Sequence, residues 1–121
     1  MLKEESTNNY NRKEILHSCD MAYAISLIEK RWSLLILCKL VHKPRRFSEL
    51  YKSVQGITER MLSLRLKELE KSSLVKKNIY AEVPVKTEYE LTELGENLSV
   101  IFDDLKKFGS KHKKMVYGSN Q

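Results

Sequence analysis

Two thiols are the side chains of this chain with the most reactive chemistry. Cys19 stands where a helix of about Asp20 to Glu29 is predicted to begin. The positive end of a helix favours a thiolate, while the charge of Asp20 opposes it. Cys38 lies inside an apolar run and is interpreted as an inert small hydrophobe. The residues alone leave open both a reactive and a purely structural Cys19, and the structural case is the commoner one.

The remaining reactive side chains give little indication of a metal site or of catalysis. His17 stands two residues before Cys19, and Cys38 stands one helical turn before His42, but neither pair matches a compact zinc-ligand spacing. The sequence contains no nucleophile elbow, phosphate-binding loop or HExxH motif, and His112 is far from the other histidines. We therefore expect no metal, no cofactor and no enzyme activity.

A basic and polar helix face points instead to nucleic acid. In a predicted helix of about Glu59 to Lys71, one face carries leucines that would anchor it to a core: Leu62, Leu66 and Leu69. The opposite face carries Arg60, Ser63, Leu64, Lys67 and Lys71, which could contact a duplex, and Arg65 lies on the flank of the helix. In the major groove we assign Arg60 to a guanine, Ser63 to a base edge and Leu64 to a thymine methyl group. Lys67 and Arg65 are assigned to phosphates. A solvated charged helix is the alternative, because three glutamates share the segment.

The segments before this helix complete a helix-turn-helix pattern. A short helix of about Ser48 to Val54, with Ser48 as its expected cap, precedes a turn in which Gly56 can take a positive φ. Thr58 then caps the longer helix. We place four residues of this region among the DNA contacts, although a solvated loop is equally open for the two arginines: Arg45, Arg46, Ser48 and Thr58.

A hairpin follows directly and is interpreted as a wing. Its predicted strands are Val75 to Tyr80 and Val85 to Leu91, and the second alternates cleanly between apolar and charged residues. Its lysines could lie along phosphates or the minor groove, or could only protect a strand edge: Lys76, Lys77 and Lys86.

The flanking helices are predicted to build the core and a dimer interface. A helix of about Ser33 to His42 is apolar almost all round and should be central and buried, and Pro44 follows it. After Thr92, a last helix carries an apolar heptad pattern that could pack on its own domain, but we favour pairing with a second subunit. The interface is predicted from seven residues: Met21, Ile25, Leu98, Ile101, Phe102, Leu105 and Phe108.

Composition places these elements in one globular domain. The chain has 121 residues, 31% of them charged, with a formal net charge of +6, which weakly favours polyanion partners. We expect a polar arm over residues 1–17, the domain over 18–110, and a fraying basic tail over 111–121. The longest apolar run is far too short to span a membrane and the polar start is no secretion signal, so a cytoplasmic protein is expected.

The middle of the chain, about Cys19 to Gly109, resembles the HxlR-type winged helix-turn-helix regulators of bacteria. The resemblance rests on several segments in order: Cys19, Lys30-Arg31-Trp32, the run from Pro44 to Leu50, Gly56-Ile57-Thr58, Leu62-Ser63 with Arg65 to Glu70, Tyr80 to Pro84, and Tyr89 to Gly95. It implies a dimeric DNA-binding regulator whose first and last helices form the interface. In several members the cysteine at the position of Cys19 senses oxidants or electrophiles, so the resemblance implies the same role for Cys19. Ser73 stands where members often carry glycine, so it should take a strained turn or a different one.

The sequence therefore predicts a mainly α fold with a small β-hairpin, a winged helix-turn-helix. The expected function is sequence-specific regulation of transcription on duplex DNA by a homodimer that reads two-fold related half-sites, with repression favoured and Cys19 as a candidate sensor. Two alternatives stay open: a regulator that responds to a small-molecule effector without thiol chemistry, and a winged-helix module that binds another protein.

Overall fold

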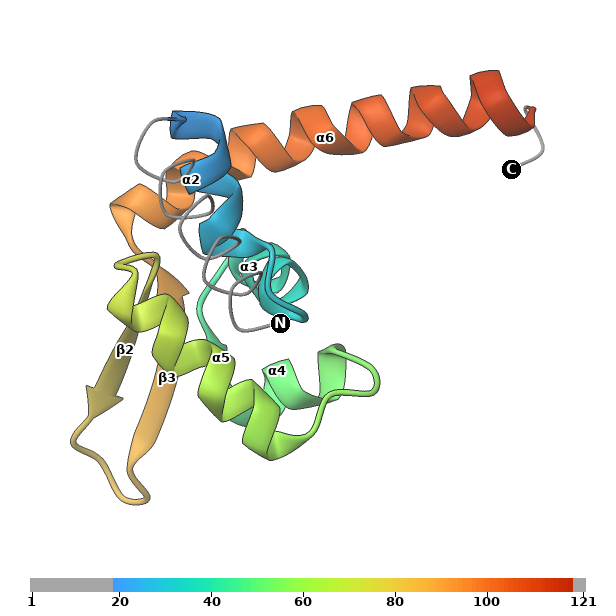
Figure 1. Ribbon diagram of the computed structural model, residues 1–121. Helices are drawn as coiled ribbons and strands as arrows, with labels where there is room; N and C mark the ends of the chain where they lie inside the picture. Colours follow the sequence, from blue (N-terminus) through green and yellow to red (C-terminus); the bar gives the residue numbers. More distant parts are fainter. Residues whose placement is uncertain (1–18, 119–121) are drawn as a thin grey trace, which may run out of the picture.

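The computed structural model describes residues 19–118 and combines helices with a three-stranded antiparallel sheet, of which Figure 1 shows the β2–β3 hairpin. The elements in chain order are α2 (Asp20–Ile28), α3 (Ser33–Leu40), β1 (Arg45–Arg46), α4 (Phe47–Ser53), α5 (Glu59–Lys71), β2 (Val75–Tyr80), β3 (Lys86–Leu91) and α6 (Glu93–Tyr117). The strand order is β1-β3-β2. Within the described residues no helix is long and apolar enough to cross a membrane. The predicted mainly α winged helix-turn-helix is confirmed.

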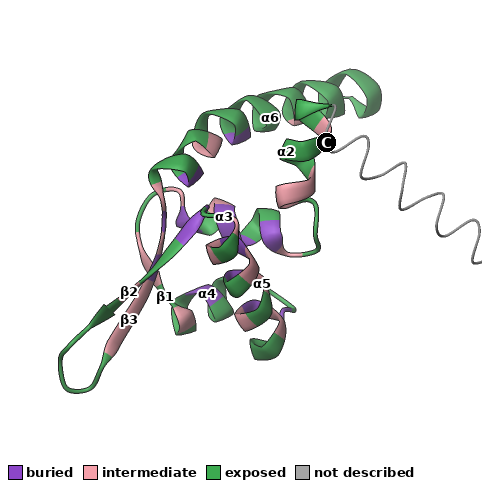
Figure 2. Ribbon diagram, turned by 60° about the vertical axis from the view of Figure 1, so that its left-hand side comes forward, coloured by how far each residue is buried: buried purple, intermediate pink, exposed green. Residues whose placement is uncertain are grey.

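The core lies where α3, α4, α5 and the base of the hairpin meet (Figure 2). Its most deeply buried side chains come from each of these elements: Ile36, Leu37, Leu40, Leu50, Leu62, Leu66, Leu69 and Val75. Burial of a leucine-sized side chain contributes about 1.5–3 kcal/mol, so this cluster fixes the position of α5 relative to the rest of the domain.

Helix α3 is central, but one side of it is open. Leu34 and Leu35 are 41% and 50% exposed, whereas Ile36 and Leu37 are fully buried. The expectation of a helix buried all round was therefore wrong, because a helix in a domain this small has core on one side only. The helix also ends at Leu40 and not at His42.

Helix α4 begins one residue earlier than predicted and with a different cap. The Arg46 backbone N–H donates to Glu49 Oε1 at 2.8 Å, and Ser48 is an exposed residue inside the helix. This hydrogen bond, with nearby Lys43 and the two arginines, lowers the pKa of Glu49. The prediction of Ser48 as cap was wrong, since the capping group is a carboxylate in the first turn.

The sheet has one strand more than the predicted hairpin. Arg45 and Arg46 pair antiparallel with Tyr89 and Glu88 of β3, which makes β3 the central strand. Strands β2 and β3 pair from Val75 with Leu91 out to Tyr80 with Lys86. The added strand ties the segment before α4 to the base of the wing.

The turn between α5 and β2 is tight and is held by α6. Ser73 has a φ of 62°, the left-handed conformation expected at this position from the resemblance. Thr92 Oγ1 donates to the Ser73 carbonyl at 2.6 Å and accepts from the Gly95 N–H at 3.0 Å. A Cβ on Gly95 would lie 2.2 Å from the Leu74 carbonyl oxygen. Only glycine therefore allows α6 to approach this turn so closely.

Helix α6 is longer than predicted. It continues to Tyr117, and its second half extends past the rest of the domain (Figure 1). We predicted a fraying tail from Lys111, but residues 111–117 are helical, so that prediction was wrong for them. Residues 119–121 and the predicted arm over 1–17 lie outside the described part of the chain.

Candidate nucleic-acid interface

Helix α5 presents its polar side to solvent because its leucines fill the core. Leu62, Leu66 and Leu69 are at most 2% exposed, while Arg60 and Lys67 lie on the solvent side. Thr58 Oγ1 accepts from the Met61 N–H at 3.1 Å, so the predicted cap is confirmed. The helix is thus a rigid element that presents one basic face.

The other predicted residues of this helix differ in how free they are. Leu64 is 47% exposed and Ser63 is half-buried. No hydrogen bond or ion pair within residues 19–118 holds the side chain of Arg60 or Lys67. These two cations can therefore reach a ligand without breaking an internal contact.

Arg65 is placed differently from the other basic residues. Its side chain is 14% exposed, its Nε donates to the Arg31 carbonyl at 2.8 Å, and its Nη1 donates to Glu68 Oε1 at 2.6 Å. Lys30 Nζ contacts the other oxygen of Glu68 at 2.5 Å. These cations lower the pKa of Glu68, Lys30 first. Arg65 thus fastens the loop between α2 and α3 to α5, a role that the sequence analysis missed. The adjacent Lys30 and Arg31 of the resemblance were the available signal.

The wing lysines lie along the hairpin and not together at its tip. Lys76 and Lys77 lie near the base of the wing, where they pair with Glu90 and Tyr89. Of the three lysines, Lys86 alone is near the tip. Lys76 Nζ is 3.2 Å from Glu90 Oε1, and Lys86 Nζ is 3.6 Å from Glu88 Oε2. The tip itself carries exposed apolar side chains that sequence reasoning did not single out: Ile79, Val83 and Val85.

The first turn of α4 and the residues before it meet the wing in a polar hollow. Arg46 and Ser48 line it together with Lys86 of β3, so three predicted residues from separate segments are brought together. Glu49 and Glu88 line the same hollow and offset part of its positive charge. Arg45 lies apart from it, half-buried, and its Nε donates to the Lys39 carbonyl at 3.2 Å.

The order of α4, turn, α5 and hairpin agrees with comparisons to known proteins. Residues 27–117 match the model of the HxlR-like helix-turn-helix family. The chain belongs to this family. It is therefore a helix-turn-helix transcriptional regulator, as predicted.

Several relatives of this family resemble the chain over most of its length. The HTH-type transcriptional regulator YtcD of Bacillus subtilis is 40% identical over 94 residues, covering 78% of this chain and 75% of YtcD. The reduced form of YodB from B. subtilis superimposes with a TM-score of 0.73 at 35% identity, covering 84% of this chain and 96% of YodB. The redox regulator HypR in its reduced form superimposes with a TM-score of 0.75 at 30% identity, covering 83% of this chain and 99% of HypR. YodB has also been solved after diamide treatment and with bound quinone.

In this HxlR-like chain the two cysteines have different surroundings. Cys19 is exposed at the N-cap of α2, in an extended conformation and without a side-chain capping bond. Cys38 is partly buried against the core, and burial raises the pKa of its thiol. Cys19 is therefore the more accessible thiol. Within residues 19–118 no three histidine, cysteine or acidic side chains gather into a metal site.

The predicted dimer residues separate into an exposed set and a core set. Met21, Ile25, Ile101, Leu105 and Phe108 are all close to half exposed or more. Leu98 is partly buried against the core, and Phe102 is only 3% exposed. The structure places Phe102 inside its own subunit, which corrects the prediction that it lies in the interface. On a helix, Phe102 points about 100° away from Ile101, and it joins the core cluster of its own subunit.

Proposed function

We propose that this regulator binds a two-fold DNA site as a homodimer, with α5 of each subunit in a major groove. The observation that supports this most directly is the division of α5, whose leucines are buried while Arg60 and Lys67 are exposed and unengaged within the described residues. In this arrangement Arg60 reads a guanine and Lys67 neutralises a phosphate, with Ser63 and Leu64 between them. Repression is the expected outcome of such binding within a promoter.

Arg46, Ser48 and Lys86 extend this surface at the N-terminus of α4 and along the wing. Their shared hollow lies beside β1, so a duplex on α5 could bring a phosphate strand to the same side. Four other predicted residues contribute less. Lys76 and Lys77 lie near the base of the wing, Arg45 is hydrogen-bonded to the Lys39 carbonyl, and Thr58 caps α5.

The test is binding of a labelled operator over a range of salt concentrations. Each phosphate contact that is lost lowers the slope of log affinity against log salt by about 0.9. Lys67→Ala should therefore weaken binding to every sequence and reduce this slope. Arg60→Ala should mainly lower the preference for operator over random DNA, by about 1–3 kcal/mol per subunit. Unchanged binding in both variants would refute the assignment of α5.

We further propose that Cys19 is the sensing thiol, in line with the redox and quinone-bound forms of its relatives. A quinone would add to the Cys19 thiolate, forming a carbon–sulfur bond while the ring takes up a proton and becomes a hydroquinone thioether. Diamide would instead take two electrons from two thiols and leave a disulfide. Operator binding by wild type and Cys19→Ser, with and without each reagent, tests this. Equal loss of binding in both proteins would remove Cys19 as the sensor, and Cys38→Ala is the matched control.

A further inference from the structure

The outward side of α6 carries two rows of exposed or half-exposed side chains with heptad spacing. Residues of the first row are seven apart and each is at least half exposed: Leu94, Ile101, Phe108 and Met115. The second row follows each of the first three by four positions: Leu98, Leu105 and His112. Such a pattern is typical of a helix that packs lengthwise against another helix. Within residues 19–118 nothing covers its second half (Figure 1).

The charges of α6 are divided between its two halves. From Glu93 to Leu105 every charged residue is acidic: Glu93, Glu96, Asp103 and Asp104. The second half, from Lys106 to Tyr117, has no acidic residue and carries all the lysines of the helix: Lys106, Lys107, Lys111, Lys113 and Lys114. Two such helices side by side in parallel would place like charges together, whereas an antiparallel pair places each acidic half beside a basic half. The charge pattern therefore selects a second copy of α6, in opposite orientation, as the partner.

We propose that the homodimer is closed by two antiparallel α6 helices in a single register, with Asp104 of each subunit beside Lys111 of the partner subunit. This rests on the proposed homodimer and adds its orientation, its register and the ion pair that selects them. Asp104 and Lys111 each follow a residue of the first row by three positions, so they flank the apolar rows on the same side. Flanking residues on one side meet each other in an antiparallel pair.

One register satisfies both the apolar rows and the charges. Placing Leu105 against the partner's Phe108 also places Leu98 against the partner's Met115 and His112 against the partner's Ile101. The same register brings Asp104 beside the partner's Lys111, twice by symmetry. A shift of one heptad in either direction would place Asp104 beside its own symmetry copy, or Lys111 beside its own. Both shifted registers are disfavoured by like-charge contact.

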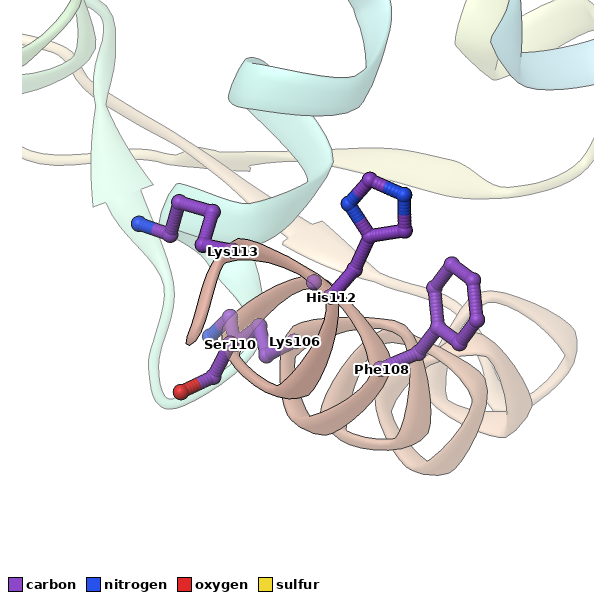
Figure 3. A pocket seen from close by; sticks show the side chains of 6 residues that line it. Lys106, Phe108, Ser110, His112 and Lys113 are labelled. Atoms are coloured by element: carbon purple, nitrogen blue, oxygen red, sulfur yellow. The ribbon is translucent and has the colours of Figure 1, made fainter. Parts of the chain in front are cut away.

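The surface near the expected two-fold axis fits a close approach. An open depression is lined by Lys106, Phe108, Gly109, Ser110, His112 and Lys113. Figure 3 shows Phe108 and His112 pointing to one side of the helix, and their ring centroids are 6.0 Å apart. A Cβ on Gly109 would meet nothing within 4 Å in its own subunit, although glycine costs a helix interior about 1 kcal/mol. A partner helix crossing here gives this glycine a structural reason.

Disulfide trapping tests the orientation, in a Cys19→Ser, Cys38→Ala background that has no other thiol. With both Asp104→Cys and Lys111→Cys, mild oxidation should give a covalent dimer. Either substitution alone should not, because in the antiparallel register each position lies about 10 Å along the axis from its own symmetry copy. Cross-linking by a single variant would indicate a register shifted by one heptad, and no cross-linking in the double variant would indicate another orientation. Either result would overturn the proposal.

Charge exchange tests the ion pair by sedimentation equilibrium. Asp104→Lys or Lys111→Asp alone places like charges together at two positions, and the dimer dissociation constant should rise about tenfold. The double variant Asp104→Lys, Lys111→Asp should recover most of that loss. No recovery would overturn the register.

Operator binding by the unsubstituted chain separates this proposal from the proposed function. A dimer that binds a two-fold site, yet fails the trapping and exchange tests, leaves the function standing and refutes only the register. A chain that sediments as a monomer at every concentration would mean that residues 1–18 or another protein cover α6, and would overturn both.

Discussion

Arg65 offers the sharpest test of how α5 is held in the domain. Sequence reasoning assigned its guanidinium to a phosphate, but in the structure it donates to the Arg31 carbonyl and to Glu68. Arg65→Ala would remove both hydrogen bonds and leave Glu68 with Lys30 alone. We therefore expect the variant to lose stability and to keep the salt dependence of DNA binding.

The magnitude follows from how buried the arginine is. Its side chain is 14% exposed, whereas that of Glu68 is 32% exposed, so solvent screens part of the ion pair. A hydrogen bond to a charged group contributes about 1.5–3 kcal/mol, and the exposed partner reduces the pair toward the lower end. We expect the free energy of unfolding to fall by about 2 kcal/mol, or a melting temperature lower by roughly 8 °C for a domain of this size.

Two measurements on the same preparations decide the question. Denaturant unfolding gives the change in stability. Operator titrations between about 50 and 200 mM salt, where affinity depends steeply on salt, give the slope of log affinity against log salt. Lys67→Ala is the matched control, because its side chain is exposed and its loss should change the slope and leave stability within about 0.5 kcal/mol. If Arg65→Ala instead reduced the slope by about 0.9 per subunit at unchanged stability, the internal role would be refuted.

Three further predictions concern stability and assembly. Gly95→Ala should lower the free energy of unfolding by about 3 kcal/mol in denaturant titration, because the new Cβ would lie 2.2 Å from the Leu74 carbonyl oxygen; a loss below 1 kcal/mol would contradict this. The pKa values of Glu49, Glu68 and Glu90 are lowered by their hydrogen bonds, so their stabilisation is complete above the ordinary carboxyl pKa and is lost as pH falls through the folded values. Unfolding at pH 7 and pH 3 should show this loss, and Glu49→Gln should reduce it. His112→Leu should tighten the dimer several-fold in sedimentation, since it places an apolar side chain against the partner's Ile101.

The sequence was sufficient to predict the fold and the orientation of α5. Leu62, Leu66 and Leu69 have a period that only a helix can bury on one side, and Thr58 marks where that helix begins. These signals are local, so they do not depend on how the chain closes in space. Strand β1 was missed because its two residues pair with Tyr89 and Glu88, more than forty positions away, and carry no pattern of their own.

Local patterns also could not separate the two apolar faces of α6. Ile101 and Phe102 are adjacent in sequence, and an apolar repeat includes either one, yet the first is half exposed and the second is in the core. Which face meets the subunit's own sheet depends on the approach at Gly95, a tertiary contact with Leu74. For the same reason the sequence analysis took Arg65 for a surface cation, since the Arg31 carbonyl that accepts its hydrogen bond lies 34 positions away in sequence.

The placement of α2 connects the proposed sensor with the proposed dimer. None of its residues is buried within the described chain, although Leu27 and Ile28 contact the core at its end. A helix so weakly packed has little stability of its own, and in the proposed dimer its exposed Met21 and Ile25 would pack against the partner subunit. Its far end passes directly into the loop that Arg65 fastens to α5. A bulky adduct at Cys19 would therefore act where α2 is held least, and the loop provides a direct route from that displacement to the angle of the reading helix.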